Sequence, residues 1–357
     1  YLHRASQRRD RADRRMTRCR RLFGRFVIMA LVSTVGMVFF GAGPASADPP
    51  GPTDYQTEIV SIEPAADIEM GVIGGDSFLE LRVLAPVEVI VLGYNAEPYL
   101  RFDADGTVYE NLRSPTRYLN EDRYGGREIP SDASADAEPE WERVDDDAHY
   151  AWHDHRAHWM NPGRPVGSEP GDTILEAVVP VTVDGREVSI AVMSTWLPAP
   201  SVWPAVLGGL VGAAVFALGL LVAGGRFVGV PAALTAAAAL AVGWLAYSSV
   251  PPEAGASLLL WALPATALVV AIVGAVALAR GPSFAGAALM AAGGLELVLW
   301  AWLRWDALVR AIVPTDGPEQ LDRAVITAAL VVGSGSIVVG GLRLFRAGQV
   351  APTPEPA

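Results

Sequence analysis

The chain has almost no cysteine: Cys19 is the only one among 357 residues. It falls in the basic part of a predicted export signal, so we expect the mature protein to have no thiol at all. That excludes disulfide bonds, thiolate nucleophiles and cysteine-based metal sites, although small exported domains often use disulfides. Lysine is absent as well, so all 27 cationic side chains are Arg. Together with the richness in Ala, Gly and Pro, this composition suggests a GC-rich bacterial genome.

The sequence also lacks the short motifs of several common enzyme classes. It contains no Gly-x-Ser-x-Gly turn, no zinc-protease motif with a glutamate and no phosphate-binding glycine loop. The glycine-rich run at residues 71–75 has no strand-loop-helix setting, and it predicts a turn. We therefore expect a protein that is not an enzyme, with a catalytic use of a histidine as a further alternative.

The N-terminal part predicts an export signal. Residues 1–15 are a polar run that leads into no apolar pattern, and we expect them to be an upstream extension of a true start at Met16. From there a basic segment, an apolar core at residues 26–40 and a small-residue site at residues 45–47 follow in order. We predict a signal peptide over residues 16–47, cleaved before Asp48.

Five apolar stretches fill the last part of the chain, and each is about as long as a bilayer is thick. They cover residues 203–223, 227–247, 258–278, 284–302 and 324–345. The hydrophobic share of 51% is also too high for an ordinary soluble chain. We predict a five-helix transmembrane bundle over residues 201–346, embedded in the lipid bilayer. A Pro-rich disordered tail is predicted over residues 347–357.

The charges between the stretches predict their orientation. Arg280 and Arg343 fall on one side of the predicted bundle, whereas Glu253 and Asp306 fall on the other. Positive charge is enriched on the cytoplasmic side of membrane proteins. We therefore predict a multi-pass plasma-membrane protein whose N-terminal domain is extracytoplasmic and whose C-terminus is cytoplasmic.

Two features inside the predicted spans bear on packing and function. Gly208 and Gly212 are four residues apart, a spacing that lets helix backbones approach closely. Glu296 is the one carboxylate inside a predicted span. Such groups are costly in a membrane and are often functional, so Glu296 is an intramembrane candidate. The alternative is that it only fixes the register of the bundle.

Residues 48–200 have a different pattern, with short β-like runs separated by turns. The runs are residues 57–62, 78–84, 87–92, 99–102, 107–109, 174–183 and 187–196. Asp105-Gly106 and Asp184-Gly185 are hairpin signals between such runs. We predict an extracytoplasmic antiparallel β-sandwich of immunoglobulin-like type, with a barrel as the alternative. Residues 111–140 lose this periodicity and predict a long surface loop.

The predicted extracytoplasmic domain is strongly acidic. Residues 48–200 contain thirty Asp and Glu residues against ten Arg. A surface of this charge repels nucleic acid and attracts cations. We therefore expect no nucleic-acid partner, and a metal ion is a candidate ligand.

Four of the five histidines lie within ten positions of one another: His149, His153, His155 and His158. If the segment is extended, His153 and His155 lie on the same face. If it is helical, His149 pairs with His153 and His155 pairs with His158. Imidazole suits Cu²⁺ or Zn²⁺, and Asp154 can act as a ligand or hold a histidine tautomer. The predicted metal site consists of His153 and His155, with His149, His158 or Asp154 completing it. The alternative is a structural patch in which the histidines make ordinary hydrogen bonds.

The segment Trp-His-Asp-His-Arg-Ala-His-Trp-Met at residues 152–160 carries a resemblance, together with residues 97–101 and 118–120. It resembles a set of uncharacterised exported multi-pass membrane proteins of GC-rich Gram-positive bacteria. The resemblance covers the acidic domain and the spans, and it implies that the two form one unit. A looser similarity is to bacterial copper-handling envelope proteins that join a β-sandwich to membrane helices. Several of those use an N-terminal histidine as a ligand, whereas the predicted new terminus here is Asp48.

The sequence thus supports two hypotheses of different classes. The first is an envelope membrane protein whose exported domain binds copper or zinc, for metal handling or sensing. The second is a scaffold or assembly factor without a metal, whose loops around residues 113–118 contact an envelope protein partner.

Overall fold

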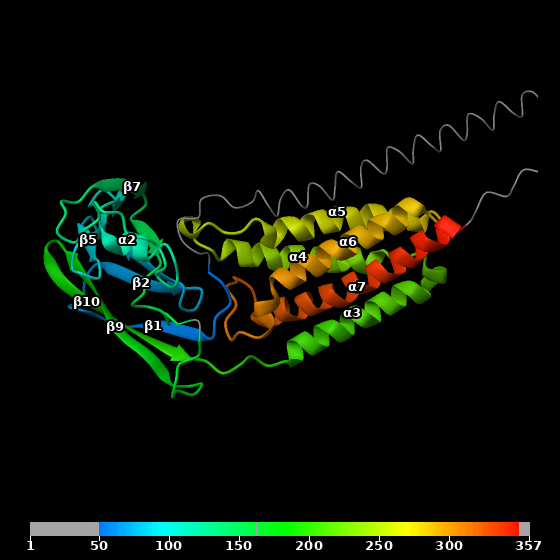
Figure 1. Ribbon diagram of the computed structural model, residues 1–357, viewed down its shortest axis with the longest axis horizontal. Helices are drawn as coiled ribbons and strands as arrows, with labels where there is room; N and C mark the ends of the chain where they lie inside the picture. The colour runs from blue at the N-terminus through cyan, green and yellow to red at the C-terminus, as the bar shows by residue number, and fades with distance from the viewer. Residues whose placement is uncertain (1–49, 162, 350–357) are drawn as a thin grey trace, which may run out of the picture.

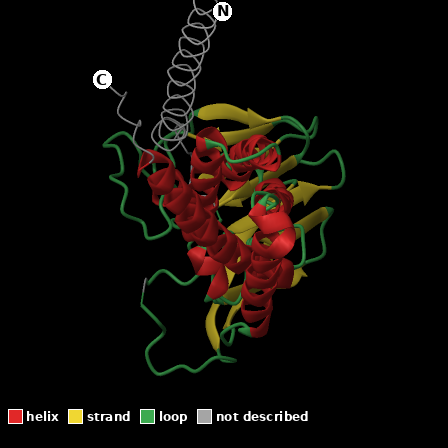
Figure 2. Cartoon of the chain, turned by 90° about the vertical axis from the view of Figure 1, so that its right-hand side faces the viewer, coloured by secondary structure: helices red, strands yellow, loops and turns green. Residues whose placement is uncertain are grey.

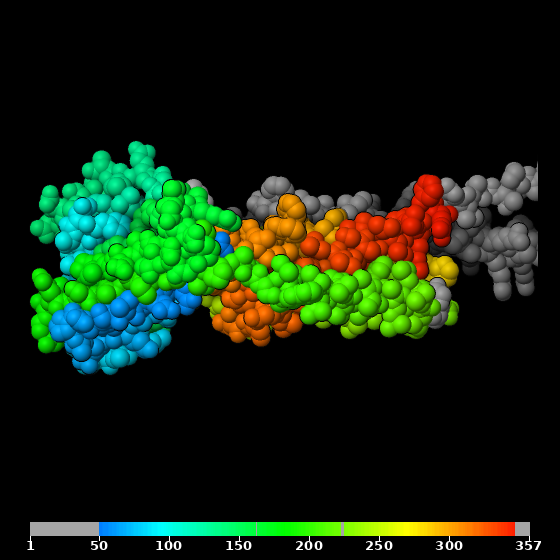
Figure 3. Space-filling model, turned by 90° about the horizontal axis from the view of Figure 1, so that it is seen from below, coloured from blue at the N-terminus to red at the C-terminus, as the bar shows by residue number. Residues whose placement is uncertain are grey.

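The computed structural model describes residues 50–161 and 163–349, which form a sheet-rich domain and a helical bundle placed end to end (Figure 1). We call residues 50–200 the head and residues 201–349 the bundle. The space-filling view from below shows the same two lobes in contact (Figure 3). The predicted extension, the predicted signal peptide and residues 350–357 lie outside the described residues.

The head contains ten strands among the described residues, and every pairing between them is antiparallel. The strands are β1 (Tyr55–Glu63), β2 (Ile68–Ile73), β3 (Phe78–Val83), β4 (Val89–Leu92), β5 (Pro98–Phe102), β6 (Val108–Asn111), β7 (Trp141–Asp145), β8 (His149–Trp152), β9 (Thr173–Val183) and β10 (Arg186–Trp196). Seven form one sheet in the order β1-β10-β9-β4-β5-β6-β7. The other three form a second sheet in the order β2-β3-β8.

One hydrophobic core joins the two sheets of the head. It contains Leu79 and Leu81 of β3 together with Val181 of β9 and Ile190 of β10, all almost completely buried. The prediction of an antiparallel sheet-rich domain is thereby confirmed. The finer assignment to an immunoglobulin-like sandwich stays a prediction.

All seven predicted β runs are strands, and both hairpin signals lie at hairpins. Asp184 and Gly185 connect β9 to β10 with φ angles of 46° and 73°, as a turn with two left-handed residues requires. The sequence did not predict β2, β7 and β8. It also missed the short helix α2 (Pro115–Leu119), which lies inside the predicted loop.

The bundle contains five helices that are long and apolar enough to cross a membrane. They are α3 (Trp203–Leu221), α4 (Val230–Ser248), α5 (Leu259–Ala279), α6 (Phe284–Leu303) and α7 (Glu319–Gln349), with short 3-10 turns η1 (Val222–Gly225), η2 (Pro252–Ala254) and η3 (Trp305–Leu308) between them. Helix α7 packs against α3, α4 and α6. Figure 2 shows the helices in front of the sheets when the molecule is seen from the bundle end.

Small residues set the closest helix contacts, as predicted. A Cβ atom added to Gly208 would lie 2.0 Å from the carbonyl oxygen of Ala324, and one added to Gly212 would lie 3.0 Å from Cα of Ala328. Helix α3 therefore needs glycine at both positions to approach α7. Glu296 is buried within α6, with 7% of its surface exposed.

Two loops of the bundle contact the head. In the α6–α7 loop, Ile312 and Thr53 exchange backbone hydrogen bonds of 3.1 and 2.8 Å, and Arg310 forms an ion pair of 2.8 Å with Asp54. The α4–α5 loop contacts β8 through η2. The second contact places the α4–α5 loop beside the strand that leads into the histidine cluster.

Candidate metal centre

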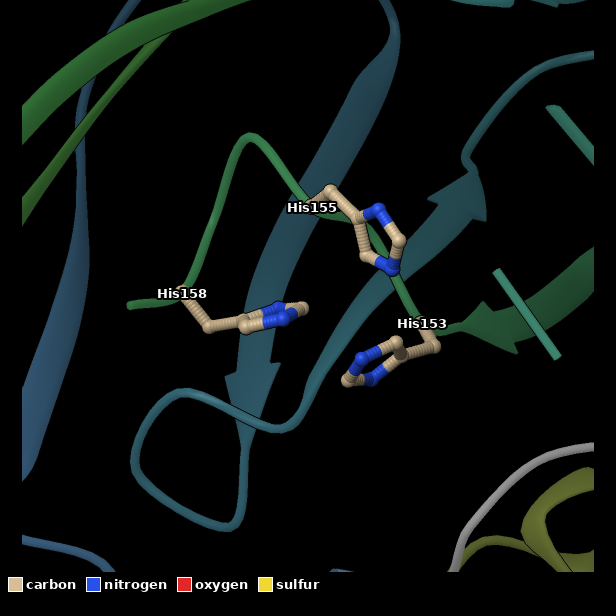
Figure 4. Close-up of side chains that lie close together, drawn as sticks. All are labelled: His153, His155 and His158. Carbon is tan, nitrogen blue, oxygen red and sulfur yellow. The ribbon is translucent and has the colours of Figure 1, made fainter. Parts of the chain in front are cut away.

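Three of the predicted histidines converge where the chain leaves β8. His153, His155 and His158, which we call the triad, turn their rings toward one another (Figure 4). Their ring centroids are 4.2 Å apart for His153 and His158, 5.2 Å for His155 and His158 and 5.7 Å for His153 and His155. One ring nitrogen from each lies within 4.8 Å of the others, so the triad could hold one metal ion.

A turn, rather than a strand or a helix, brings the three rings together. The buried carboxylate of Asp154 accepts hydrogen bonds from Nε1 of Trp152 and from the backbone and guanidinium nitrogens of Arg156, at 2.7–3.0 Å. The hydroxyl of Thr57 on β1 donates to the carbonyl of Ala157 and fixes the far side of the turn. We call Trp152, Asp154 and Arg156 the clamp, because together they reverse the chain between His153 and His158.

His153 is oriented by the turn between β2 and β3. Its Nδ1 lies 2.6 Å from the carbonyl oxygen of Ser77. A carbonyl only accepts hydrogen bonds, so Nδ1 carries the proton and Nε2 presents a lone pair. This side chain is 4% exposed, and its buried Nε2 has no hydrogen-bond partner among the described residues. A buried nitrogen of this kind is costly unless it has a ligand.

His155 is held by the predicted loop between β6 and β7. Its Nε2 lies 2.9 Å from the carbonyl oxygen of Asp122, and its ring stacks on Tyr94 with the centroids 5.8 Å apart. The hydroxyl of Tyr94 also accepts a hydrogen bond of 2.8 Å from the backbone N–H of His155. The same loop thus covers the triad and helps to orient it.

His158 faces two carbonyl oxygens, from Asp154 at Nδ1 (3.0 Å) and from Arg123 at Nε2 (2.8 Å). A neutral imidazole has only one N–H to donate. The second nitrogen therefore presents a lone pair to a carbonyl oxygen, which is an unfavourable contact inside a protein. For a metal ion to bind that nitrogen, the ring has to turn away from the carbonyl oxygen.

The triad is built to stay uncharged. Burial, together with the nearby charge of Arg123, lowers the pKa of His153 to about 4 and that of His158 to about 3. Burial also lowers the pKa of His155. Three neutral imidazoles keep their lone pairs available at neutral pH, which is the form that binds metal.

Sequence reasoning missed the residues that surround the triad from other parts of the chain. Arg123 and Asp76 form an ion pair of 2.5 Å next to it, and Asp76 is completely buried. Burial raises the pKa of Asp76, and Arg123 opposes this rise. The backbone carbonyls of Ser77, Asp122 and Arg123 contact the rings. Carbonyl contacts leave no signature in the sequence, so only the fold reveals them.

The remaining predicted site residues lie elsewhere. His149 begins β8, away from the triad, where its ring pairs with the carboxylate of Glu80 on β3. The carboxylate of Asp154 binds Trp152 and Arg156 in the clamp. Asp154 therefore supports the triad, but its carboxylate does not point at the three rings. Glu296 belongs to the bundle core rather than to this centre.

The three nitrogens lie close to the spacing that one metal ion requires. A Zn–N distance of about 2.0–2.1 Å puts two ligand nitrogens of a tetrahedral site roughly 3.4 Å apart, so nitrogens within 4.8 Å of one another need to close by at most about 1.4 Å. Three histidines leave a fourth coordination position open, as in sites where the metal exchanges or reacts. No protein-family model, curated protein or solved structure matches this chain.

Proposed function

We propose that this protein is an envelope membrane protein whose exported head binds one divalent transition ion, copper or zinc, through His153, His155 and His158. Its role is metal handling or sensing at the outer face of the plasma membrane. The observation that carries the proposal is the convergence of three neutral imidazoles, two of them buried and one partly buried. One of the buried rings has a nitrogen without a hydrogen-bond partner among the described residues. The open fourth position favours an ion that is exchanged over one that only holds the fold together.

The exposed side chains of the bundle support a membrane location. Leu210, Leu218, Val269 and Phe345 each expose half or more of their surface along the helices. Large exposed apolar surfaces mark contacts with lipid or with other proteins. The positions of Arg280 and Arg343 on one side of the spans, and of Glu253 and Asp306 on the other, support an orientation with the head outside the cell.

The scaffold hypothesis gains no specific contact from the structure. The carboxylate of Glu97 accepts hydrogen bonds from Ser114 and Thr116 at the start of α2, and Arg117 pairs with Glu110 at 2.7 Å. The loop around residues 113–118 therefore uses these side chains inside the head. An envelope protein partner stays a proposal that rests on the sequence alone.

Metal stoichiometry tests the proposed function directly. The full chain, purified in detergent, stripped with a chelator and reloaded, is expected to bind one Zn²⁺ or Cu²⁺ per chain by elemental analysis. His149→Ala is the matched control, because His149 lies in the same segment but outside the triad. We expect this variant to keep the full stoichiometry. A loss of metal in His149→Ala would contradict the assignment of the three ligands.

The pH dependence of metal release provides a second test. Free imidazoles titrate near pH 6.5, so an exposed histidine cluster would release its metal near pH 6. In the triad the pKa values are about 4 for His153 and about 3 for His158, so protons compete with the metal only at lower pH. We expect half-release below pH 5, measured by dialysis and elemental analysis across a pH series. Half-release at pH 6 or above would show that the rings titrate as exposed groups.

A further inference from the structure

A cavity of about 590 Å³ lies between the head and the α4–α5 loop of the bundle, and His153 forms part of its wall. Four carboxylates, Glu110, Glu121, Glu142 and Glu253, line it against three cations, Arg117, Arg127 and Arg143. The first three carboxylates come from the head and are paired with Arg117 or Arg127. Glu253 comes from η2 of the bundle. Burial raises its pKa, and the charge of the nearby His149 opposes this rise.

Unsatisfied polar atoms belong to three of the residues that line this cavity. Nε2 of His153, Nδ2 of Asn120 and Oε2 of Glu253 have no hydrogen-bond partner among residues 50–161 and 163–349. His153 and Asn120 are 4% and 3% exposed. Buried polar atoms without partners are rare in folded proteins, so their presence around one cavity indicates a polar or charged guest.

Glu253 is held directly beside the strand that leads to the triad. The backbone of Ala151 on β8 hydrogen-bonds to its carboxyl group. The neighbouring Ala254 is completely buried against Phe78 and Ala151. The Glu253 carboxylate thus belongs to the bundle, but it is held beside Ala151, which precedes His153 by two residues in the sequence.

A second, smaller cavity of about 290 Å³ also touches His153, on the side of the α6–α7 loop. Its wall contains two cations, Arg123 and Arg310, against two carboxylates, Asp54 and Asp306. Arg123 also lowers the pKa of all three histidines, so its charge faces any cation that approaches from this side. The larger cavity has the more favourable charge for a cation.

We propose that a divalent cation reaches the triad through the larger cavity, and that Glu253 is the last carboxylate it contacts before Nε2 of His153. This inference rests on the proposed function, because it describes the route to the same centre. A hydrated ion with six waters occupies roughly 180 Å³ at about 30 Å³ per water, so the cavity can admit it. Since Glu253 belongs to the α4–α5 loop, the bundle provides one wall of the route and contributes to the rate of metal exchange.

The test measures rates and affinity separately, in the full chain reconstituted in nanodiscs of zwitterionic lipid. Co²⁺ is the probe, because its absorption spectrum reports the coordination of the bound ion. Glu253→Gln keeps an oxygen that can accept the hydrogen bond from Ala151 but removes the charge. We expect it to slow both Co²⁺ uptake and chelator-driven release about fivefold, because one charge contributes only part of the roughly 10–10³-fold effect that a whole charged cleft has on association. The dissociation constant should stay within about threefold and the spectrum should not change.

Asp306→Asn in the smaller cavity is the matched control, and we expect it to leave both rates unchanged. Slower exchange in Asp306→Asn but not in Glu253→Gln would place the route on the other side and overturn the inference. Unchanged rates in both variants would overturn it as well, and so would an altered spectrum in Glu253→Gln, which would make Glu253 a ligand. A wild-type protein that gives no Co²⁺ spectrum would instead refute the proposed function, before any variant is compared.

Discussion

Replacing His153 and His158 together by Ala is expected to lower the affinity for Zn²⁺ or Cu²⁺ by at least about 10³-fold. Even the loss of a residue that only hydrogen-bonds to a metal ligand costs about 10–100-fold in affinity, and this variant loses two ligands. One imidazole, His155, is left, and a single neutral ring on an acidic surface holds a divalent ion only weakly. Chelator competition with the full chain in detergent measures the change.

Thermal unfolding separates this effect from a loss of folding. A ligand present at 100 times its dissociation constant stabilises a protein by about 2.7 kcal/mol, so added metal should raise the melting temperature of the wild type and of His149→Ala. In the double variant the apo protein should still unfold cooperatively, but metal should no longer shift the transition. Metal uptake equal to that of the wild type would refute the triad as the binding site.

Strands with regular alternation and their own turn chemistry could be predicted from the sequence. The pair β9 and β10 is an example, because each strand alternates and Asp184-Gly185 makes the turn between them. Strands β7 and β8 could not be predicted in this way. β8 contains His149 and Tyr150 without a clear alternation, and it becomes a strand by pairing with β3, about 70 residues earlier in the chain. Long-range pairing of this kind has no local signal.

The membrane-type helices were predicted nearly in full, because a run of about 20 apolar residues is a strong signal by itself. The one large difference is the start of α7, which begins at Glu319 instead of residue 324. Glu319 and Asp322 interrupt the apolar run, but carboxylates in a first turn favour the start of a helix. Arg323 pairs with Glu319 one turn away at 2.9 Å and extends the helix further.

The candidate centre could be predicted as a set of histidines but not as a geometry. Spacing alone allowed two histidines to share one face of either a strand or a helix. The structure has neither arrangement, because the carboxylate of Asp154 binds Trp152 and Arg156 and the chain reverses in a turn. Spacing also kept His149 as a residue that could complete the site. Only the pairing of His149 with Glu80 on the neighbouring strand separates it from the triad.

Replacing Asp154 by Ala is expected to destabilise the head by about 3–5 kcal/mol, the usual cost of breaking a buried ion pair on one side. Asp154 is 1% exposed and its partner Arg156 has 14% of its side chain exposed, so the variant leaves a buried guanidinium and Nε1 of Trp152 unpaired. Burial alone would raise the pKa of Asp154, but the charge of Arg156 and the hydrogen bonds from Arg156 and Trp152 together outweigh it and lower the pKa, so the carboxylate is ionised at neutral pH. For a domain of this size, the melting temperature should fall by roughly 10 °C.

Asp146→Ala is the matched control, because Asp146 pairs with Arg143 at the surface, where an ion pair contributes at most about 1 kcal/mol. The lowered pKa of Asp154 also fixes the sign of the pH effect. Its contribution to stability is complete above the ordinary pKa near 3.9 and is lost as the pH falls through the lower folded value.

Adding Arg156→Met to Asp154→Ala should recover much of the stability, because no buried charge is then left unpaired. Metal affinity should stay reduced about 10–100-fold in the double variant, since the turn that orients the triad has lost its clamp. Recovery of both stability and metal affinity would mean that the three rings converge without Asp154.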